Sequence, residues 1–388
     1  MQTFKPHPVV MTLALVVTVL VGAIARPALA TDVSQSNVKR ELEAYFDDFF
    51  ESEPSWGGTL VAKDGGILFE KSYGWADHSQ ARPNTRKTVF RIQSLSKTFT
   101  AIATLMLVER GRLALNDRVI DYVPELVEGE EVTIRHLLRM ESGIFNFTDN
   151  PTTWQDSERF RYPEELLELF VDYPLNFEPG TQFEYSNSNF VLLGLIIERV
   201  TGKTYGQFLN RRIFRPLKMR RSRFDPWDLA FARIRAVGYE DISQDPPILA
   251  AYYPPYLAYA AGGILSTARD LLKYDQALYG ERLLSQETLE RAFTPGPAGY
   301  GLGWVIGYVP VRGERHKLVW HSGGGPGFRS LLMRMVDARV TLVLVFNTTG
   351  EDVAGDKVMS ERKRWIQYRK VIKRLGEDVG EIVLGSSE

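Results

Sequence analysis

Short apolar runs lie near both ends of the chain, separated by a long middle part with a different pattern. The first two runs flank Asp64-Gly65, which is typical of a β-hairpin because both turn positions favour a positive φ. Four later runs are rich in β-branched, leucine and aromatic residues and are predicted as strands. They cover 303–309, 317–320, 330–335 and 340–346. Strands at both ends indicate one sheet built from distant segments.

The middle of the chain has helical periodicity instead. Helices are predicted there over 97–110, 163–172 and 188–200, and an earlier amphipathic helix over 37–53. Gly111 and Gly202 follow two of them, as glycine commonly does where a helix ends. We therefore expect a mainly helical insertion packed beside the sheet. The predicted domain spans 31–388, with the sheet from about 37–90 and 300–375 and the insertion from about 97–290.

The N-terminus resembles a secretory signal peptide over residues 1–30. Lys5 precedes an apolar run over 9–25, and Ala28-Leu29-Ala30 provides an A-x-A cleavage site before Thr31. Whether or not cleavage occurs, the rest of the chain is predicted to be exported, and cleavage would make the protein periplasmic or secreted. An uncleaved membrane anchor is the alternative, because the run is long enough for a marginal span.

The C-terminal segment 361–375 combines an apolar side with many lysines and arginines. A basic amphipathic helix can lie on a membrane surface. Packing of its apolar side on the protein's own sheet is the preferred interpretation.

Composition excludes several kinds of chemistry. The formal net charge of −1 favours neither a nucleic-acid partner nor an anionic membrane. The absence of cysteine excludes disulfides, thiolate nucleophiles and Cys-ligated zinc. The patterns G-x-S-x-G, H-E-x-x-H, G-x-G-x-x-G and the P-loop are absent. His78, His136 and His316 lack metal-ligand spacing, so neither a metal nor another cofactor is expected.

A candidate nucleophile is Ser94, in an S-x-x-K pattern with Lys97. Two other such patterns begin at Ser36 and Ser360, but only Ser94 stands where an extended segment meets a strongly apolar helix. At the start of that helix, Ser94 would lie at the positive end of the dipole, and Lys97 would share its face. A buried lysine has a lowered pKa and can accept the serine proton. The alternative is an N-cap serine beside a surface lysine.

A second candidate element is Tyr185-Ser186-Asn187, the one Y-x-N pattern in the chain. Tyr185 could act as a base if a cation such as Lys97 lowered its pKa. Asn187 offers a donor and an acceptor for an amide-bearing substrate. A buried tyrosine followed by an asparagine helix cap is the alternative.

A third element runs from His321 through Gly323, Gly324 and Gly325, where a predicted strand gives way to glycines. Glycines let a substrate approach the backbone, whose N–H groups can face an oxyanion. His321 could donate a hydrogen bond to substrate or to Tyr185. A structural histidine before a plain turn is the alternative.

The ordered set S-x-x-K, Y-x-N and H-x-G resembles the serine β-lactamase and penicillin-binding protein (D,D-peptidase) superfamily, in its class C β-lactamase-related branch. Further similar stretches lie at 90–100, 132–143, 183–187, 261–270 and 300–304, so the resemblance covers roughly 40–350. It implies an α+β fold: an antiparallel sheet flanked by helices, with an inserted mainly helical region and the active site between them.

The resemblance also implies residue roles. Ser94 attacks the carbonyl, Lys97 and Tyr185 relay its proton, and Asn187 holds the substrate's amide. The backbone N–H groups of Ser94 and Gly324 form the oxyanion hole, with His321 and Gly323 alongside the substrate. Water then hydrolyses the acyl-enzyme.

Two positions depart from the family pattern. His321 stands where lactamases and many peptidases carry a lysine, and Arg139-Met140-Glu141 replaces the common Thr-His-Thr before Ser-Gly. The first departure favours esterase, peptidase or amidohydrolase activity over β-lactam hydrolysis. The second bears on substrate preference.

The sequence therefore predicts an exported serine hydrolase acting on an ester or amide, such as a D-amino-acid peptide or a β-lactam. The expected partner is a small-molecule or peptide substrate, with a membrane contact only if the N-terminal segment stays uncleaved. The alternative is a catalytically silent cell-wall or partner-binding protein of the same fold. The tyrosine-rich segment 252–259 is interpreted either as a wall of the substrate cleft or as a cover over the core.

Overall fold

The computed structural model describes residues 35–52, 54–155, 162–224, 233–296, 298–349 and 361–385. The predicted signal peptide lies outside these residues, as does Ser360. Among the described residues, no helix combines the length and apolar character needed to cross a bilayer.

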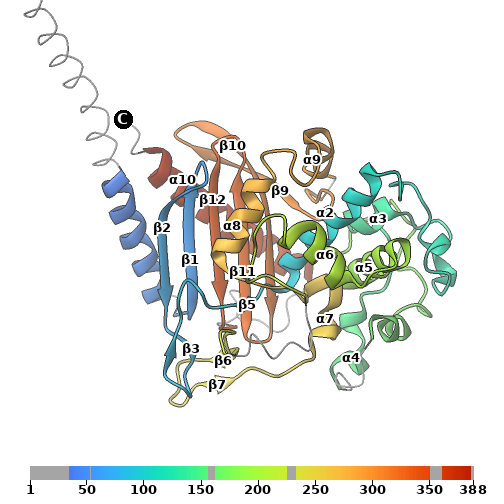
Figure 1. Ribbon diagram of the computed structural model, residues 1–388, viewed down its shortest axis with the longest axis horizontal. Coiled ribbons are helices and arrows are strands. Elements are labelled where there is room, and N and C mark those ends of the chain that lie inside the picture. The colour runs from blue at the N-terminus through green and yellow to red at the C-terminus, as the bar shows by residue number, and fades with distance from the viewer. Residues whose placement is uncertain are drawn as a thin grey trace, which may run out of the picture.

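A six-stranded antiparallel sheet forms the centre of the molecule, in the order β2-β1-β12-β11-β10-β9 (Figure 1). Its strands are β1 (Gly57–Lys63), β2 (Gly66–Tyr73), β9 (Val305–Val311), β10 (Glu314–Gly325), β11 (Phe328–Met335) and β12 (Val340–Phe346). β1 pairs with β12, so the two ends of the chain do build one sheet. The predicted hairpin is confirmed, with positive φ at both Asp64 and Gly65.

Three short strand pairs lie outside this sheet. They are β3 (Trp75–Asp77) with β4 (Arg82–Pro83), β5 (Phe90–Arg91) with β8 (Leu265–Ser266), and β6 (Tyr239–Asp241) with β7 (Ile248–Leu249). The β5–β8 pair is the one that matters for the site, because β5 leads directly to Ser94.

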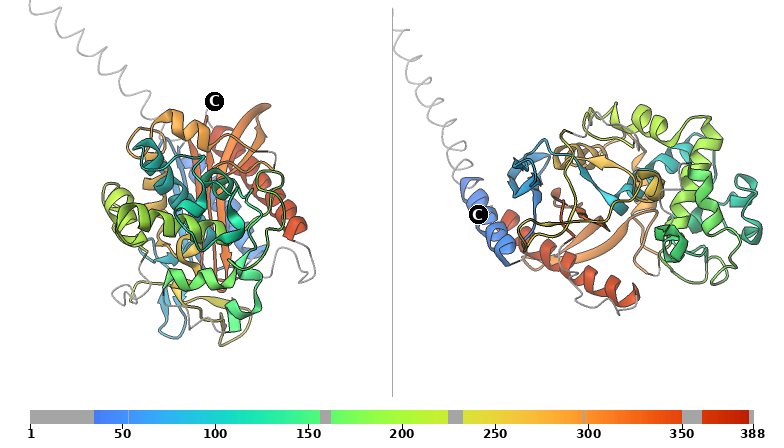
Figure 2. Two further views of the ribbon diagram at one scale, coloured as in Figure 1. Left: turned by 90° about the vertical axis from the view of Figure 1, so that its right-hand side faces the viewer. Right: turned by 90° about the horizontal axis from the view of Figure 1, so that it is seen from below.

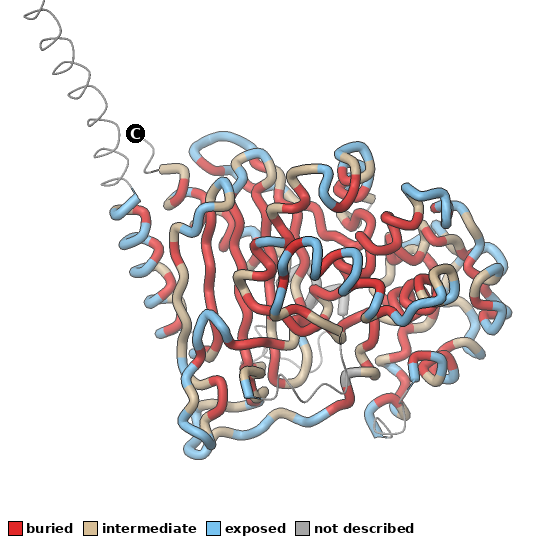
Figure 3. Tube along the Cα trace, in the orientation of Figure 1, coloured by how far each residue is buried: buried red, intermediate tan, exposed pale blue. Residues whose placement is uncertain are grey.

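Helices cover both faces of the sheet, and strand burial follows from this (Figures 1 and 3). The helix over 35–52 and α10 (Glu361–Gly385) lie on one face, and α8 (Ala268–Ala277) lies on the other (Figure 2). Every residue of β12 is buried. A strand that is covered on both faces has a continuous run of apolar residues in place of alternating apolar and polar ones.

The C-terminal helix packs on the sheet as preferred from the sequence, and it extends ten residues beyond the predicted 375. Its buried positions Ile372, Leu375, Val379 and Val383 face the core. A Cβ at Gly376 would lie 3.0 Å from the Leu318 side chain, so the helix sits close against β10.

Most of the helical region between β5 and β9 stands beside the sheet, at the right of Figure 1, whereas α8 lies over the sheet itself. Its α-helices are α2 (Ser96–Glu109), α3 (Ile134–Arg139), α4 (Pro151–Gln155), α5 (Asn187–Thr201), α6 (Tyr205–Leu209), α7 (Pro255–Gly262) and α9 (Gln286–Ala292), in addition to α8. Single-turn or irregular pieces include η1 (Gln93–Leu95), η2 (Val119–Asp121), η3 (Val127–Gly129), η4 (Phe147–Asp149), η6 (Pro163–Leu169) and the π-type η7 (Asn210–Phe214). The α+β fold predicted from the resemblance is confirmed.

Two sequence predictions need correction. The segment predicted as a helix over 163–172 is a 3₁₀ helix ending at Leu169. Pro163, Leu166 and Leu169 are all buried, and their spacing of three suits a helix with three residues per turn. The predicted strand over 317–320 does not end before the glycines: β10 continues through Gly325, paired with Phe328 of β11.

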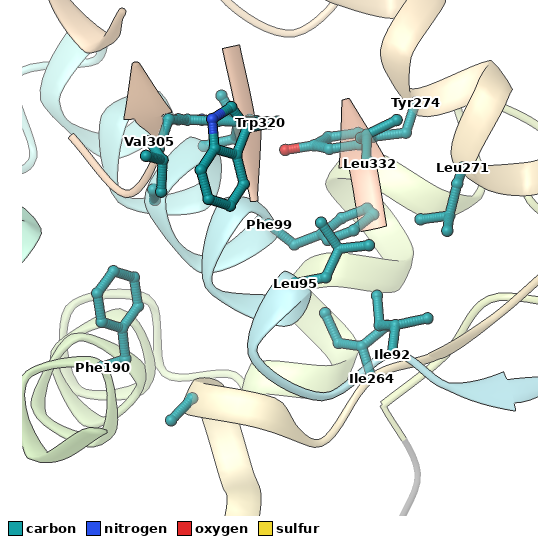
Figure 4. Packing of buried hydrophobic residues seen from close by; sticks show 14 of the residues in the cluster. Ile92, Leu95, Phe99, Phe190, Ile264, Leu271, Tyr274, Val305, Trp320 and Leu332 are labelled. Carbon is teal, nitrogen blue, oxygen red and sulfur yellow. The ribbon is translucent and has the colours of Figure 1, made fainter. Parts of the chain in front are cut away.

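The core continues from the sheet into the helical region through α2. Phe99 of α2 stacks on Tyr274 of α8 with ring centroids 3.9 Å apart. Ile92, Leu95 and Ile264 pack together directly beneath the start of α2 (Figure 4). The segment that carries Ser94 is thus fixed from below by fully buried side chains.

Candidate active site

Ser94 lies in η1, the single 3₁₀ turn between β5 and α2, and not in the first α-helical turn. It remains partly exposed, while its neighbours Gln93 and Leu95 are buried. Gln93 has φ of +50°, a left-handed conformation that is unfavourable for a residue with a side chain. The strained residue directly before Ser94 turns the chain sharply, so the hydroxyl is presented at the surface while the rest of the turn is packed.

Lys97 is the most confined polar group of the site, with no exposed surface. Its Nζ atom lies 3.0 Å from Ser94 Oγ, 2.7 Å from Asn187 Oδ1 and 2.8 Å from the backbone oxygen of Ala261. These contacting groups are all neutral. Burial therefore holds the pKa of Lys97 well below its usual value.

The oxygen of Ala261 reaches Lys97 because α7 approaches α5 closely. A Cβ at Gly194 of α5 would lie 2.5 Å from the Tyr259 ring and 2.6 Å from Ala260 Cβ, so a larger residue there would push α7 away. Tyr259 itself has φ of +32° inside α7, which kinks that helix. These backbone features place the Ala261 carbonyl on the lysine.

Tyr185 and Asn187 come to the same point from the start of α5. Lys97 Nζ lies 5.0 Å from the centroid of the Tyr185 ring and 5.6 Å from that of Phe190. The structure therefore brings the first two sequence elements together around one amine.

The side chain of Asn187 is oriented by residues 146–148. Its Nδ2 atom lies 3.2 Å from both Asn146 Oδ1 and Thr148 Oγ1, and its backbone N–H donates to Asn146 Oδ1 at 2.9 Å. With Nδ2 directed at two oxygens, Oδ1 is the atom that faces Lys97.

His321 is nearly fully buried, and its ring forms a hydrogen bond with the hydroxyl of Tyr300. The distance from Nε2 to the Tyr300 hydroxyl is 3.0 Å, and Nδ1 lies 2.6 Å from the Ser322 carbonyl oxygen. The ring centroids of His321 and Tyr185 are 6.5 Å apart. Burial, with a smaller effect of the nearby Lys97, lowers the pKa of His321 to about 3, so its imidazole is neutral at ordinary pH.

The glycine run of β10 passes directly against η1, the turn that carries Ser94. A Cβ at Gly323 would lie 2.2 Å from the Ile92 oxygen, whereas a Cβ at Gly324 would meet nothing within 4 Å. β10 pairs with β9 only as far as Trp320, so the edge of β10 beyond that residue is not covered by β9. Open space at Gly324 therefore adjoins the turn that carries Ser94.

The unusual segment Arg139-Met140-Glu141 supports the residues around Tyr185. The Met140 backbone oxygen accepts from Glu184 N at 2.9 Å, and its Sδ atom contacts Ser186 N and Asn189 Nδ2. Arg139 and Glu141 form an ion pair at 3.7 Å, and burial raises the pKa of Glu141.

Sequence reasoning missed four residues that contact the site: Gln93, Asn146, Ala261 and Tyr300. Three of them lie in stretches that the family resemblance had already drawn attention to: Gln93 in 90–100, Ala261 in 261–270 and Tyr300 in 300–304. Asn146 lies outside those stretches. Within them no residue pattern singled out Gln93 or Ala261, because Gln93 acts through a strained φ and Ala261 through its backbone oxygen.

Comparison with known proteins gives consistent matches over most of the chain. A protein-family model described as Beta-lactamase matches residues 55–360. Penicillin-binding protein 4* of Bacillus subtilis (strain 168) is 32% identical over 331 residues, which cover 81% of this chain and 72% of that protein.

Solved structures show the same fold. The D-amino acid amidase from Ochrobactrum anthropi SV3, complexed with L-phenylalanine amide, superimposes with a TM-score of 0.73 at 25% identity over 92% of this chain and 99% of that one. A penicillin binding protein from Bacillus halodurans gives a TM-score of 0.71 at 27% identity over 84% of this chain and 98% of that one.

Proposed function

The chain belongs to the Beta-lactamase family, and we propose that it is an exported serine hydrolase that forms an acyl-enzyme at Ser94. Relatives in this superfamily include penicillin-binding proteins and D-amino acid amidases. The observation that carries the proposal is the fully buried Lys97 amine 3.0 Å from Ser94 Oγ.

The contacts of Lys97 suit a neutral amine acting as a base. A neutral amine has two N–H groups and one lone pair. The side-chain oxygen of Asn187 and the backbone oxygen of Ala261 can accept hydrogen bonds from these two N–H groups. The lone pair is then left to accept the hydroxyl proton of Ser94. The lowered pKa of Lys97 supports this protonation state.

In the proposed reaction, Ser94 Oγ bonds to the substrate carbonyl carbon while its proton passes to Lys97. The carbonyl oxygen becomes an oxyanion beside the backbone N–H groups of Ser94 and Gly324. The bond to the leaving oxygen or nitrogen then breaks, and Lys97 and Tyr185 return the proton to the leaving group. Water attacks the acyl-enzyme and regenerates Ser94.

We further propose an ester or amide of a D-amino acid or a D-amino-acid peptide as the substrate class. The amidase and penicillin-binding relatives support this choice. His321 is neutral and engaged with Tyr300, so the site lacks a permanent cation at that position. Hydrolysis of β-lactams is therefore the less favoured activity.

The test is intact-mass spectrometry of the mature protein after exposure to a fluorophosphonate, p-nitrophenyl esters and penicillins. We expect a covalent adduct on the parent protein and none on Ser94→Ala. The fastest-reacting reagent would narrow the substrate class. Absence of any adduct on folded parent protein would overturn the proposal and favour a silent binding protein of the same fold.

A further inference from the structure

Two aromatic side chains from distant segments meet beside the site. Trp154 of α4 and Tyr253 lie edge to face, with ring centroids 6.3 Å apart and an interplanar angle of 83°. Trp154 is 49% exposed, and the adjacent Tyr252 is 68% exposed. Large apolar surface left in water beside a reactive serine is a candidate contact for a ligand.

Trp154 is connected to the Asn187 side of the site. Its indole Nε1 donates to the Thr148 backbone oxygen at 2.9 Å. The hydroxyl of the same threonine accepts from Asn187 Nδ2 at 3.2 Å. The indole is therefore held by the residue that also orients Asn187.

Tyr253 is connected to the nucleophile. Its hydroxyl donates a hydrogen bond to Gln93 Oε1 at 2.7 Å, and Gln93 directly precedes Ser94 in the sequence. The guanidinium of Arg91 lies 4.7 Å from the centroid of the Tyr253 ring, and its Nη1 donates to the Tyr253 oxygen at 3.2 Å. These contacts fix the ring in place.

We infer that the exposed side chains of Trp154 and Tyr252, with the buried ring of Tyr253 supporting Trp154 from behind, form an aromatic rim that binds a bulky apolar or aromatic group next to the substrate's reacting carbonyl. This inference rests on the proposed function and narrows its substrate class. On one side the rim contacts Asn187, the residue proposed to hold the substrate's amide, through Thr148. On the other side it contacts Gln93, which directly precedes Ser94. An aromatic acyl group would cover the exposed indole and remove apolar surface from water.

The test compares kcat/KM for p-nitrophenyl acetate and p-nitrophenyl phenylacetate, which share one leaving group. We expect Trp154→Ala to lower kcat/KM for the phenylacetyl ester roughly tenfold and for the acetyl ester less than twofold. Tyr253→Phe keeps the ring and removes only the hydroxyl, so the preference should survive. The matched control is Tyr308→Ala, which removes a tyrosine on β9 that is 40% exposed. It should leave kcat/KM for both esters unchanged.

Labelling of Ser94 by a fluorophosphonate in every variant separates the outcomes. If Ser94 is labelled but Trp154→Ala affects both esters equally, or neither, the rim is overturned while the proposed hydrolase stands. If Ser94 is not labelled in the parent protein, the proposed function fails and the rim fails with it.

Discussion

The hydroxyl of Tyr300 lies 3.0 Å from Nε2 of His321, and both side chains are buried. Because Nδ1 faces the carbonyl oxygen of Ser322, Nδ1 carries the proton and Nε2 accepts from Tyr300. Protonation of His321 would put two donors face to face at Nε2 and the Tyr300 hydroxyl unless the tyrosine turned. The arrangement thus stabilises a neutral imidazole.

The first prediction follows from the pKa of His321, which burial lowers to about 3. Between about pH 3 and about 6.5 the unfolded chain binds a proton at this residue and the folded chain does not. The free energy of unfolding should therefore fall as the pH falls through this range, by up to about 1.4 kcal/mol per pH unit from this group. Urea denaturation at several pH values between 4 and 7 gives the free energy of unfolding of the parent and of His321→Gln. This free energy should change less steeply with pH in the variant. Equal slopes would contradict a neutral buried imidazole.

The second prediction concerns the acid limb of the rate profile, which we assign to Lys97 because its amine must be neutral to accept the Ser94 proton. The chain has no cysteine, so Lys97→Cys creates a single thiol. Alkylation of that thiol in the unfolded protein with bromoethylamine, followed by refolding, gives a lysine analogue with a less basic amine. Activity should return, and the acid limb of kcat/KM should move to lower pH. An acid limb at the parent's position would argue against Lys97 as the base.

The third prediction concerns the proton relay itself. Lys97→Ala and Tyr185→Phe should each lower the rate of acylation by on the order of a hundredfold or more, because each removes a group proposed to move the proton. Tyr185→Phe retains a ring beside residue 97, so its effect reports on the hydroxyl alone. Stopped-flow release of nitrophenol measures acylation, and circular dichroism verifies folding. Near-parental rates in both variants would refute the relay.

The sequence was sufficient to predict the parts of the site that depend on local spacing. Ser94 and Lys97 are three residues apart in a segment that leads into a helix, so a helical geometry alone brings them together. The hairpin at Asp64-Gly65 was likewise predictable, since the residue types at the turn determine its conformation.

Contacts between distant segments could not be read in the same way. The Ala261 oxygen reaches Lys97 only because Gly194 allows α7 to approach α5, and any residue at 261 has a backbone oxygen. His321 was predicted to reach Tyr185 or substrate, yet its ring nitrogens lie within hydrogen-bond distance of the Tyr300 hydroxyl and the Ser322 carbonyl oxygen. Tyr185 precedes α5 and Tyr300 precedes β9, so the choice between them depends on how distant segments pack around His321, which local patterns do not specify.

The fourth prediction tests the close approach of β10 to the turn that carries Ser94. Gly323→Ala would place a Cβ 2.2 Å from the backbone oxygen of Ile92, so either β10 or the turn must move. We expect a loss of acylation of about a hundredfold, since displacement by about 1 Å is enough to disrupt reacting geometry. Gly280→Ala is the control, because nothing lies within 4 Å of its added Cβ. Parental activity in Gly323→Ala would show that this contact is not needed to hold Ser94.

The fifth prediction concerns stability at a buried ion pair between the sheet and α8. Arg334 of β11 and Asp275 of α8 are both fully buried, and the arginine Nε donates to an Asp275 carboxylate oxygen. The second oxygen of Asp275 accepts from Thr341 Oγ1 at 2.6 Å. Because Arg334→Met leaves a buried carboxylate without its cation, it should lower the free energy of unfolding by about 3–5 kcal/mol.

The double variant Arg334→Met with Asp275→Leu removes both charges and should recover much of the loss, since no unpaired charge then remains buried. Urea denaturation of the parent, Arg334→Met and the double variant measures the three free energies of unfolding. A double variant no more stable than Arg334→Met would mean that packing around the arginine, including its contact with the Tyr279 ring at 4.5 Å, dominates over charge pairing. Fluorophosphonate labelling of Ser94 in the same proteins should be unchanged under native conditions, because the pair lies on α8 and β11 and not among the contacts of Lys97.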